Sequence, residues 1–271
     1  MKEHTWVSSR NKRLSVMVHT PAGFTEGTPV FVFCHGFTGD KIGANQLTKN
    51  LADFIEQLGY GVVRFDYAGS GDSEGDFAKD TSVVGWRQDL ESIVTWVHEQ
   101  SDFKQSPILL YGHSLGGLVV LTHPADDRRI TARIVFAPVT QVVENFRDII
   151  LGQDLWQQAL RGESIKNFYG RAFTLNPQFV EDLVTNTYSP TDNLVDTKQP
   201  MLFIHGTADN VVPLVGTQLI HAAYRGQKEL AITDFDHVAA GQQQELQQII
   251  GNWLANQLPR AMTTTQERGK A

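Results

Sequence analysis

The chain has 271 residues, of which 41% are hydrophobic, 10% aromatic and 20% charged. These proportions are ordinary for a soluble globular protein and too apolar for a disordered one. The 23 basic and 30 acidic residues give a net charge of −7, which argues against nucleic acid as a partner. The single Cys34 excludes an internal disulfide and a cysteine-rich metal cluster. Residues 1–15 hold no apolar leader, and no run approaches the roughly 18 apolar residues of a membrane span, so we expect a cytoplasmic protein with no membrane partner.

Short β-branched runs alternate along the chain with longer segments of helical period, a pattern typical of a parallel sheet covered by helices. A hairpin is predicted first, at Thr5–Val7 and Leu14–His19. The main strands are predicted at Val30–Cys34, Gly61–Phe65, Ile108–Tyr111, Arg133–Phe136 and Met201–His205. Apolar residues recur near i, i+3, i+4 and i+7 in the predicted helices, Asn45–Leu58, Val83–Gln100, Val215–Tyr224 and Gln242–Gln257.

The connection from Pro138 to Pro200 is much longer than a crossover helix requires. We therefore predict an inserted lid at residues 138–190, rich in aromatic residues and with helical period over Asp148–Leu160. Residues 1–137 and 191–260 would form the core, and 261–271 a loose tail.

A candidate nucleophile lies in Gly112-His113-Ser114-Leu115-Gly116, between a predicted strand and an apolar helical run. This is the G-x-S-x-G pattern in the strand, turn and helix context that it requires. The glycines allow the sharp turn that exposes Ser114, and the Leu115 N–H at the helix start can stabilise an oxyanion. The alternative interpretation is a glycine-rich helix start with a capping serine.

A second oxyanion donor is predicted in the loop that follows the strand Val30–Cys34. The Phe37 N–H is the candidate, and Gly36 lets the chain pass close to the nucleophile. We interpret His35 as a residue that holds this loop rather than as a catalytic one.

Serine is a weak nucleophile and needs a base in contact with it. Among nine histidines, His237 is the candidate because it follows the run Leu230–Thr233 and precedes the last helix, as the order serine, acid, histidine requires. The acid should follow the preceding strand, where Asp209 stands. Asp234 and Asp236 are alternatives because they lie beside His237 in sequence.

Taken together, these motifs resemble the α/β-hydrolase superfamily over nearly the whole chain. Within it, His35-Gly36-Phe37-Thr38-Gly39, the size of the lid and the acid-to-histidine interval resemble small bacterial carboxylesterases, including the cinnamoyl (feruloyl) esterases. The resemblance implies an α/β-hydrolase fold with a mostly parallel sheet and a lid over the acyl pocket. It also implies that Tyr169 contacts the substrate and that Asn145 stands near the position expected for an acidic or amide partner of the substrate.

We therefore predict a serine carboxylesterase that acts on small or aromatic esters, with hydroxycinnamoyl esters as one option, through an acyl-enzyme. No metal or organic cofactor is implied, the expected partner is a small-molecule ester, and a homodimer is one option for the assembly. The alternatives are a thioesterase or monoacylglycerol-type lipase, a C–C or peptide-bond hydrolase, and a non-catalytic ligand receptor on the same fold.

Overall fold

The computed structural model describes residues 1–170, 173–194 and 197–257. Within them, the main sheet has eight strands in the order β1-β2-β4-β3-β5-β6-β9-β10. The strands from β4 to β10 run parallel, whereas β2 is antiparallel to both β1 and β4. The strands span Lys2–Ser9 (β1), Lys12–His19 (β2), Val30–Cys34 (β3), Gly61–Phe65 (β4), Ile108–His113 (β5), Ile130–Phe136 (β6), Met201–Gly206 (β9) and Lys228–Thr233 (β10).

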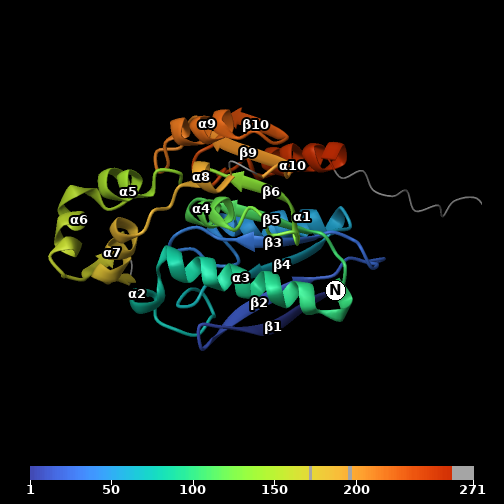
Figure 1. The fold of residues 1–271 in the computed structure, drawn as a ribbon, viewed down its shortest axis with the longest axis horizontal. Coiled ribbons are helices and arrows are strands. Elements are labelled where there is room, and N and C mark those ends of the chain that lie inside the picture. Colours follow the sequence, from blue (N-terminus) through green and yellow to red (C-terminus); the bar gives the residue numbers. More distant parts are fainter. Residues whose placement is uncertain (171–172, 195–196, 258–271) are drawn as a thin grey trace, which may run out of the picture.

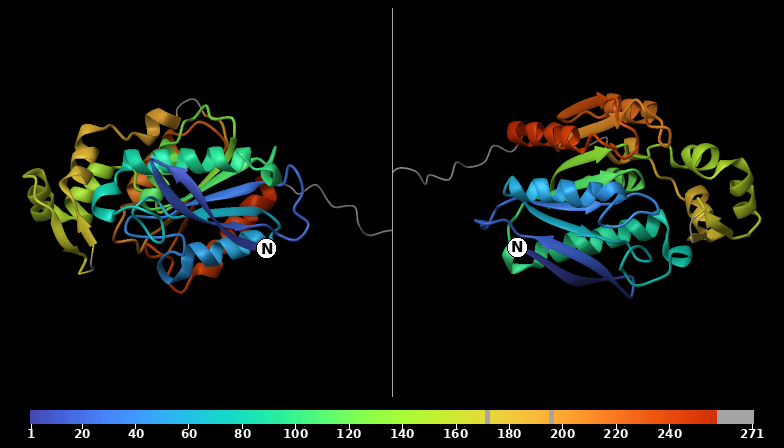
Figure 2. Two further views of the ribbon diagram at one scale, coloured as in Figure 1. Left: turned by 90° about the horizontal axis from the view of Figure 1, so that it is seen from below. Right: turned by 180° about the vertical axis from the view of Figure 1, so that it is seen from behind.

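The central strands are apolar throughout because both of their faces are covered. In β3, Val30, Val32 and Cys34 pack against one layer of helices, and Phe31 and Phe33 against the other. Figure 2 shows α3 on one side of the sheet and α1 with α10 on the other. The helices span Leu47–Gln57 (α1), Phe77–Asp80 (α2), Val83–Glu99 (α3), Leu115–Thr122 (α4), Leu214–Ala223 (α9) and Gln243–Gln257 (α10).

The predicted strands and helices are confirmed, with small shifts at their ends. The hairpin is longer than predicted, because the turn at Arg10 and Asn11 has positive φ at both positions and joins β1 directly to β2. Helix α1 begins two residues late, since Asn45 and Gln46 adopt left-handed conformations.

The segment between β6 and β9 lies beyond one end of the sheet, where Figure 1 shows α5, α6 and α7 side by side. The helix predicted from Asp148 begins only at Gly152, because a π-helical turn precedes it. The elements beyond the end of the sheet are α5 (Val142–Asn145), the π-helical turn Phe146–Ile150, α6 (Gly152–Leu160), β7 (Ile165–Phe168), β8 (Phe173–Leu175) and α7 (Pro177–Thr185). The last helix before β9, α8 (Pro190–Leu194), instead packs against α4 and α9 of the core. The tail predicted at 261–271 lies outside the described residues.

Across the described ranges, no helix combines the length and the apolar character that crossing a lipid bilayer demands.

Candidate active site

Ser114 occupies a sharp turn between β5 and α4, with φ 56° and ψ −121°. A residue with a side chain rarely adopts this positive φ, and such strain is found where the surrounding structure enforces it. A Cβ atom at Gly112 would lie 2.5 Å from the Gly116 carbonyl oxygen, and one at Gly116 would lie 2.4 Å from two carbonyl oxygens of the loop after β3. The turn therefore requires glycine at both positions.

The loop after β3 passes directly beside the serine. A Cβ atom on Gly36 would lie 3.0 Å from the Cβ atom of Ser114. The next residue is Phe37, and Leu115 is the first residue of α4. Within the described residues, neither the Phe37 N–H nor the Leu115 N–H donates a hydrogen bond to the protein. Both groups are therefore available to an external acceptor beside Ser114.

His237 and Asp209 meet through the fold although 28 residues separate them. The His237 Nδ1–H donates a hydrogen bond of 2.8 Å to Asp209 Oδ2. The other carboxylate oxygen accepts the N–H groups of Val211 at 2.8 Å and Val212 at 2.9 Å. Burial alone would raise the pKa of Asp209, but the bond to His237, its charge and these two N–H groups hold it below the usual range. The carboxylate thus stays ionised and is held against His237 Nδ1.

The two rival aspartates have other partners. Asp236 Oδ1 accepts the N–H groups of Val238 and Ala240, and Asp234 Oδ1 accepts the Gln242 amide. Both side chains shape the loop that carries the histidine, and neither contacts its ring in these bonds.

A cleft of about 610 Å³ joins most of the predicted site residues. Its lining includes Ser114, His237, Phe37, Tyr169 and Ile150. Tyr169 is 54% exposed, and its ring centroid lies 4.1 Å from that of Phe168, which places it at the rim.

Asn145 does not line this cleft. Its side chain is buried, and its Nδ2 donates a hydrogen bond of 2.8 Å to the Val211 carbonyl oxygen. It lines a separate hollow of about 180 Å³ instead. The structure thus places Asn145 against the loop of Asp209, and its expected contact with substrate stays a prediction.

Two further histidines, the half-buried His113 and the buried His205, contact the segments that carry His237 and Asp209. His113 Nε2–H donates 2.8 Å to the His237 carbonyl oxygen, so the residue before the serine anchors the backbone of the base. His205 Nε2–H donates 3.0 Å to the Val212 carbonyl, and its Nδ1 accepts the Thr217 hydroxyl at 2.7 Å. Burial lowers the pKa of both rings, to about 3 for His113. Both rings are therefore neutral. In the sequence, their position beside a glycine at the carboxyl end of a strand could have pointed to this structural role.

The loop after β3 is held from two sides. His35 donates from Nδ1 to the Gly36 carbonyl and accepts the Tyr67 N–H at Nε2, which agrees with the predicted loop-holding role. Further along, the Lys41 N–H and its ammonium group donate to both oxygens of the buried Asp66, each at 2.5 Å. Burial lowers the pKa of Lys41, but the hydrogen bonds to Asp66 and Asp72 and the charges of these carboxylates together leave the pKa above its ordinary value.

A family comparison agrees with this geometry. The family model described as serine aminopeptidase, S33, matches residues 26–165, slightly more than half of the chain. The chain belongs to the serine aminopeptidase S33 family. It is therefore a hydrolase, and the matched range holds Ser114 and the oxyanion loop but ends before Asp209 and His237.

Proteins that are similar to this hydrolase in sequence or structure have different described activities. A 31.7 kDa uncharacterized protein from the traX-finO intergenic region of Escherichia coli is 26% identical over 233 residues, 74% of this chain and 80% of that protein. The mitochondrial palmitoyl-protein thioesterase ABHD10 of Rattus norvegicus is 28% identical over 193 residues, 68% of this chain and 60% of that protein. Est1E from Butyrivibrio proteoclasticus, solved with ferulic acid bound, superposes with a TM-score of 0.82 at 20% identity, covering 94% of this chain and all of that one. The fold is that of the α/β-hydrolases.

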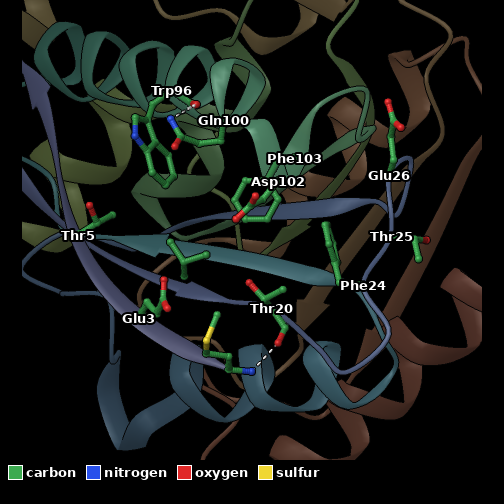
Figure 3. Close-up of a pocket in the computed structure, with 12 residues that line it drawn as sticks. Glu3, Thr5, Thr20, Phe24, Thr25, Glu26, Trp96, Gln100, Asp102 and Phe103 are labelled. Atoms are coloured by element: carbon green, nitrogen blue, oxygen red, sulfur yellow. Dashed lines mark hydrogen bonds between the residues drawn. The ribbon is translucent and has the colours of Figure 1, made fainter.

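Another hollow, of about 430 Å³, lies between the amino-terminal hairpin and the end of α3 (Figure 3). Its labelled side chains mix carboxylates with aromatic rings, and the three candidate catalytic residues do not line it.

Two clusters of histidine and carboxylate lie elsewhere in the described chain, one at His19, Asp53 and Glu56 and the other at Glu91, His123 and Asp127. Each is in contact with a cationic side chain: Lys2 donates to Asp53 in the first, and Arg129 to Asp127 in the second. These carboxylates are neutralised by the protein itself.

Proposed function

We propose that this hydrolase is a serine carboxylesterase that works through an acyl-enzyme, with Ser114, His237 and Asp209 as its triad. The observation that carries the proposal is the 2.8 Å contact between His237 and Asp209, in the cleft that also holds the strained Ser114. Asp209 fixes the tautomer in which His237 Nε2 can accept a proton.

In the acylation half, Ser114 Oγ attacks the ester carbonyl carbon while its proton passes to His237 Nε2. The tetrahedral intermediate then expels the alcohol, which takes that proton from His237. In the deacylation half, water gives a proton to His237 and attacks the acyl carbon, and the proton returns to Ser114 as the acid leaves.

The negative charge on the former carbonyl oxygen would be held by the N–H groups of Phe37 and Leu115. Their lack of a protein acceptor within the described chain and their position on either side of the serine support this assignment. A donor of this kind contributes on the order of 3 kcal/mol to transition-state stabilisation.

The lining of the cleft favours an uncharged acyl group. Apolar residues such as Phe37, Leu47, Ile150 and Val238 line much of it, together with the carboxylate of Asp40, and its described lining includes no lysine or arginine. A phosphate-rich leaving group such as coenzyme A would find no countercharge there. Tyr169 lies at the rim, and an aromatic ring there supports small or aromatic esters, hydroxycinnamoyl esters among them.

A second candidate is a thioesterase, because the ABHD10 relatives are described as palmitoyl-protein thioesterases. The same triad can attack a thioester carbonyl. Matched acyl esters and thioesters of increasing chain length, with acyl-CoA beside them, separate the two candidates. A preference of kcat/KM for long-chain thioesters would favour the thioesterase.

The decisive test is Ser114→Ala assayed with p-nitrophenyl acetate and a fluorophosphonate probe. We expect loss of both turnover and labelling in a variant that remains folded. Ser101→Ala, at an exposed serine of the short helix Ser101–Phe103, is the matched control. Substantial turnover by Ser114→Ala would reject the assignment, and absence of labelling in the wild type would favour the non-catalytic receptor.

A further inference from the structure

The start of the inserted segment, residues 145–150, contacts three parts of the active site. We call this segment the lid root. Asn145 bonds to the loop of the acid, Phe146 packs on the oxyanion residue, and Ile150 lines the cleft. All three side chains are buried, so the lid root packs between the loop of Asp209 and the loop of Phe37.

Asn145 holds the loop of Asp209 at Val211, the residue whose N–H binds the Asp209 carboxylate. Its Nδ2 donates 2.8 Å to the carbonyl of Val211, and the N–H of the same Val211 donates 2.8 Å to Asp209. The Val211 carbonyl oxygen can only accept a hydrogen bond, so the Asn145 side chain must point its nitrogen, and not its oxygen, toward it. Loss of this donor would free the peptide that orients the Asp209 carboxylate.

The contact of Phe146 is with the side chain of the oxyanion residue. The rings of Phe146 and Phe37 meet edge to face with centroids 5.1 Å apart. Phe179 of α7 stacks on Phe37 at 5.0 Å and contacts Phe146 at the same distance. Aromatic pairs of this kind prefer defined orientations. The ring of Phe37, and with it the backbone that carries its N–H, is thereby held by the inserted segment.

The π-helical turn explains how one short segment makes all these contacts. The Leu151 N–H bonds to the Phe146 carbonyl five residues earlier, so the turn holds one more residue than an α-helix would. The extra residue leaves Ile149 45% exposed and turns Ile150 inward. Asn145, Phe146 and Ile150 thus share one face.

We propose that Asn145 and Phe146 are positioning residues, through which the lid root sets the geometry of Asp209 on one side and of the Phe37 N–H on the other. This proposal rests on the proposed esterase function. The lid would then complete the catalytic arrangement in addition to covering the substrate. Small displacements of catalytic groups reduce turnover steeply while leaving ground-state binding largely intact.

The test compares Asn145→Asp, which keeps the shape but removes the donor, and Phe146→Leu, which keeps an apolar side chain but removes the ring. Ile149→Ala, at the outward residue of the same turn, is the matched control. Each full-length variant is assayed with p-nitrophenyl butyrate, with active sites counted by exhaustive fluorophosphonate labelling. Inhibition by butylboronic acid, which becomes tetrahedral on the serine, is compared with inhibition by planar butyramide.

We expect both variants to lose at least about ten-fold in kcat per labelled site and to bind the boronic acid more weakly by a similar factor. KM and butyramide inhibition should stay within about two-fold, and the control should match the wild type. A merely structural role would lower the number of labelled sites but leave kcat per site unchanged, and that result would overturn the proposal. If Asn145→Asp does not fold, Asn145→Leu, which has a similar volume and no hydrogen-bond donor, takes its place with the same criteria. Failure of the esterase function itself is distinguished by turnover that survives Ser114→Ala.

Discussion

The neutral, half-buried His113 makes the stability of this hydrolase depend on pH, and the size of the effect follows from its pKa. Its ring donates to the His237 carbonyl and stacks on Phe136 with centroids 5.2 Å apart. Burial, together with the charge of a protonated His237, lowers its pKa to about 3. His113→Gln should retain a donor at the same reach while removing the titrating group.

The sign follows from the two pKa values of His113. The unfolded chain takes up a proton near pH 6.5, whereas the folded protein resists it to about pH 3. The contribution is therefore complete above about pH 6.5 and is lost as the pH falls toward about 3, at about 1.4 kcal/mol per pH unit. At about pH 5 the wild type should have lost about 2 kcal/mol through this residue alone.

Urea unfolding of both proteins between about pH 7 and pH 5 measures this loss. At pH 7 the variant should be less stable, because it lacks the stacked ring, and its deficit relative to the wild type should shrink by about 2 kcal/mol by pH 5. His98→Gln, on the exposed face of α3, is the matched control. A constant difference between wild type and His113→Gln across this range would refute the reasoning.

Three further predictions concern the triad, the elbow and the oxyanion loop. Asp209→Asn should lower kcat by about 10⁴-fold at unchanged fold, because the His237 ring loses its oriented tautomer; a loss below ten-fold, measured by steady-state kinetics, would contradict this. Gly116→Ala should abolish activity or soluble expression, since its Cβ would lie 2.4 Å from backbone oxygens that cannot move aside; a fully active variant would show that the turn is looser. Lys41→Met should lower the free energy of unfolding by about 3–5 kcal/mol, because it leaves the buried Asp66 without its cation; a thermal unfolding temperature equal to that of the wild type would count against it.

Much of the fold could be predicted because its signals are local. The strand Val30–Cys34 is apolar along its whole length, which is the pattern of a strand covered on both faces. The start of α1 was placed too early because the periodicity continues through Asn45 and Gln46, and only their left-handed backbone ends the helix. The π-helical turn at Phe146–Ile150 was missed because the extra residue breaks the spacing on which helix prediction depends.

In the candidate site, too, the residues with a local sequence signal could be predicted and the others could not. Ser114 carries a motif that is contiguous in sequence, and His237 and Asp209 could be placed by their order along the chain. The role of Asn145 depends on a hydrogen bond to a backbone carbonyl 66 residues away, and no feature of its neighbours in sequence indicates that partner.

The wide turn at Phe146–Ile150 also bears on how relatives of this protein can diverge. Such a turn is what a single inserted codon leaves behind when a helix absorbs it without unfolding. Removing that codon would rotate every later side chain of the helix by about 100°. Two relatives that differ by this one insertion would then present different side chains to their ligands, although the rest of their sequences is similar.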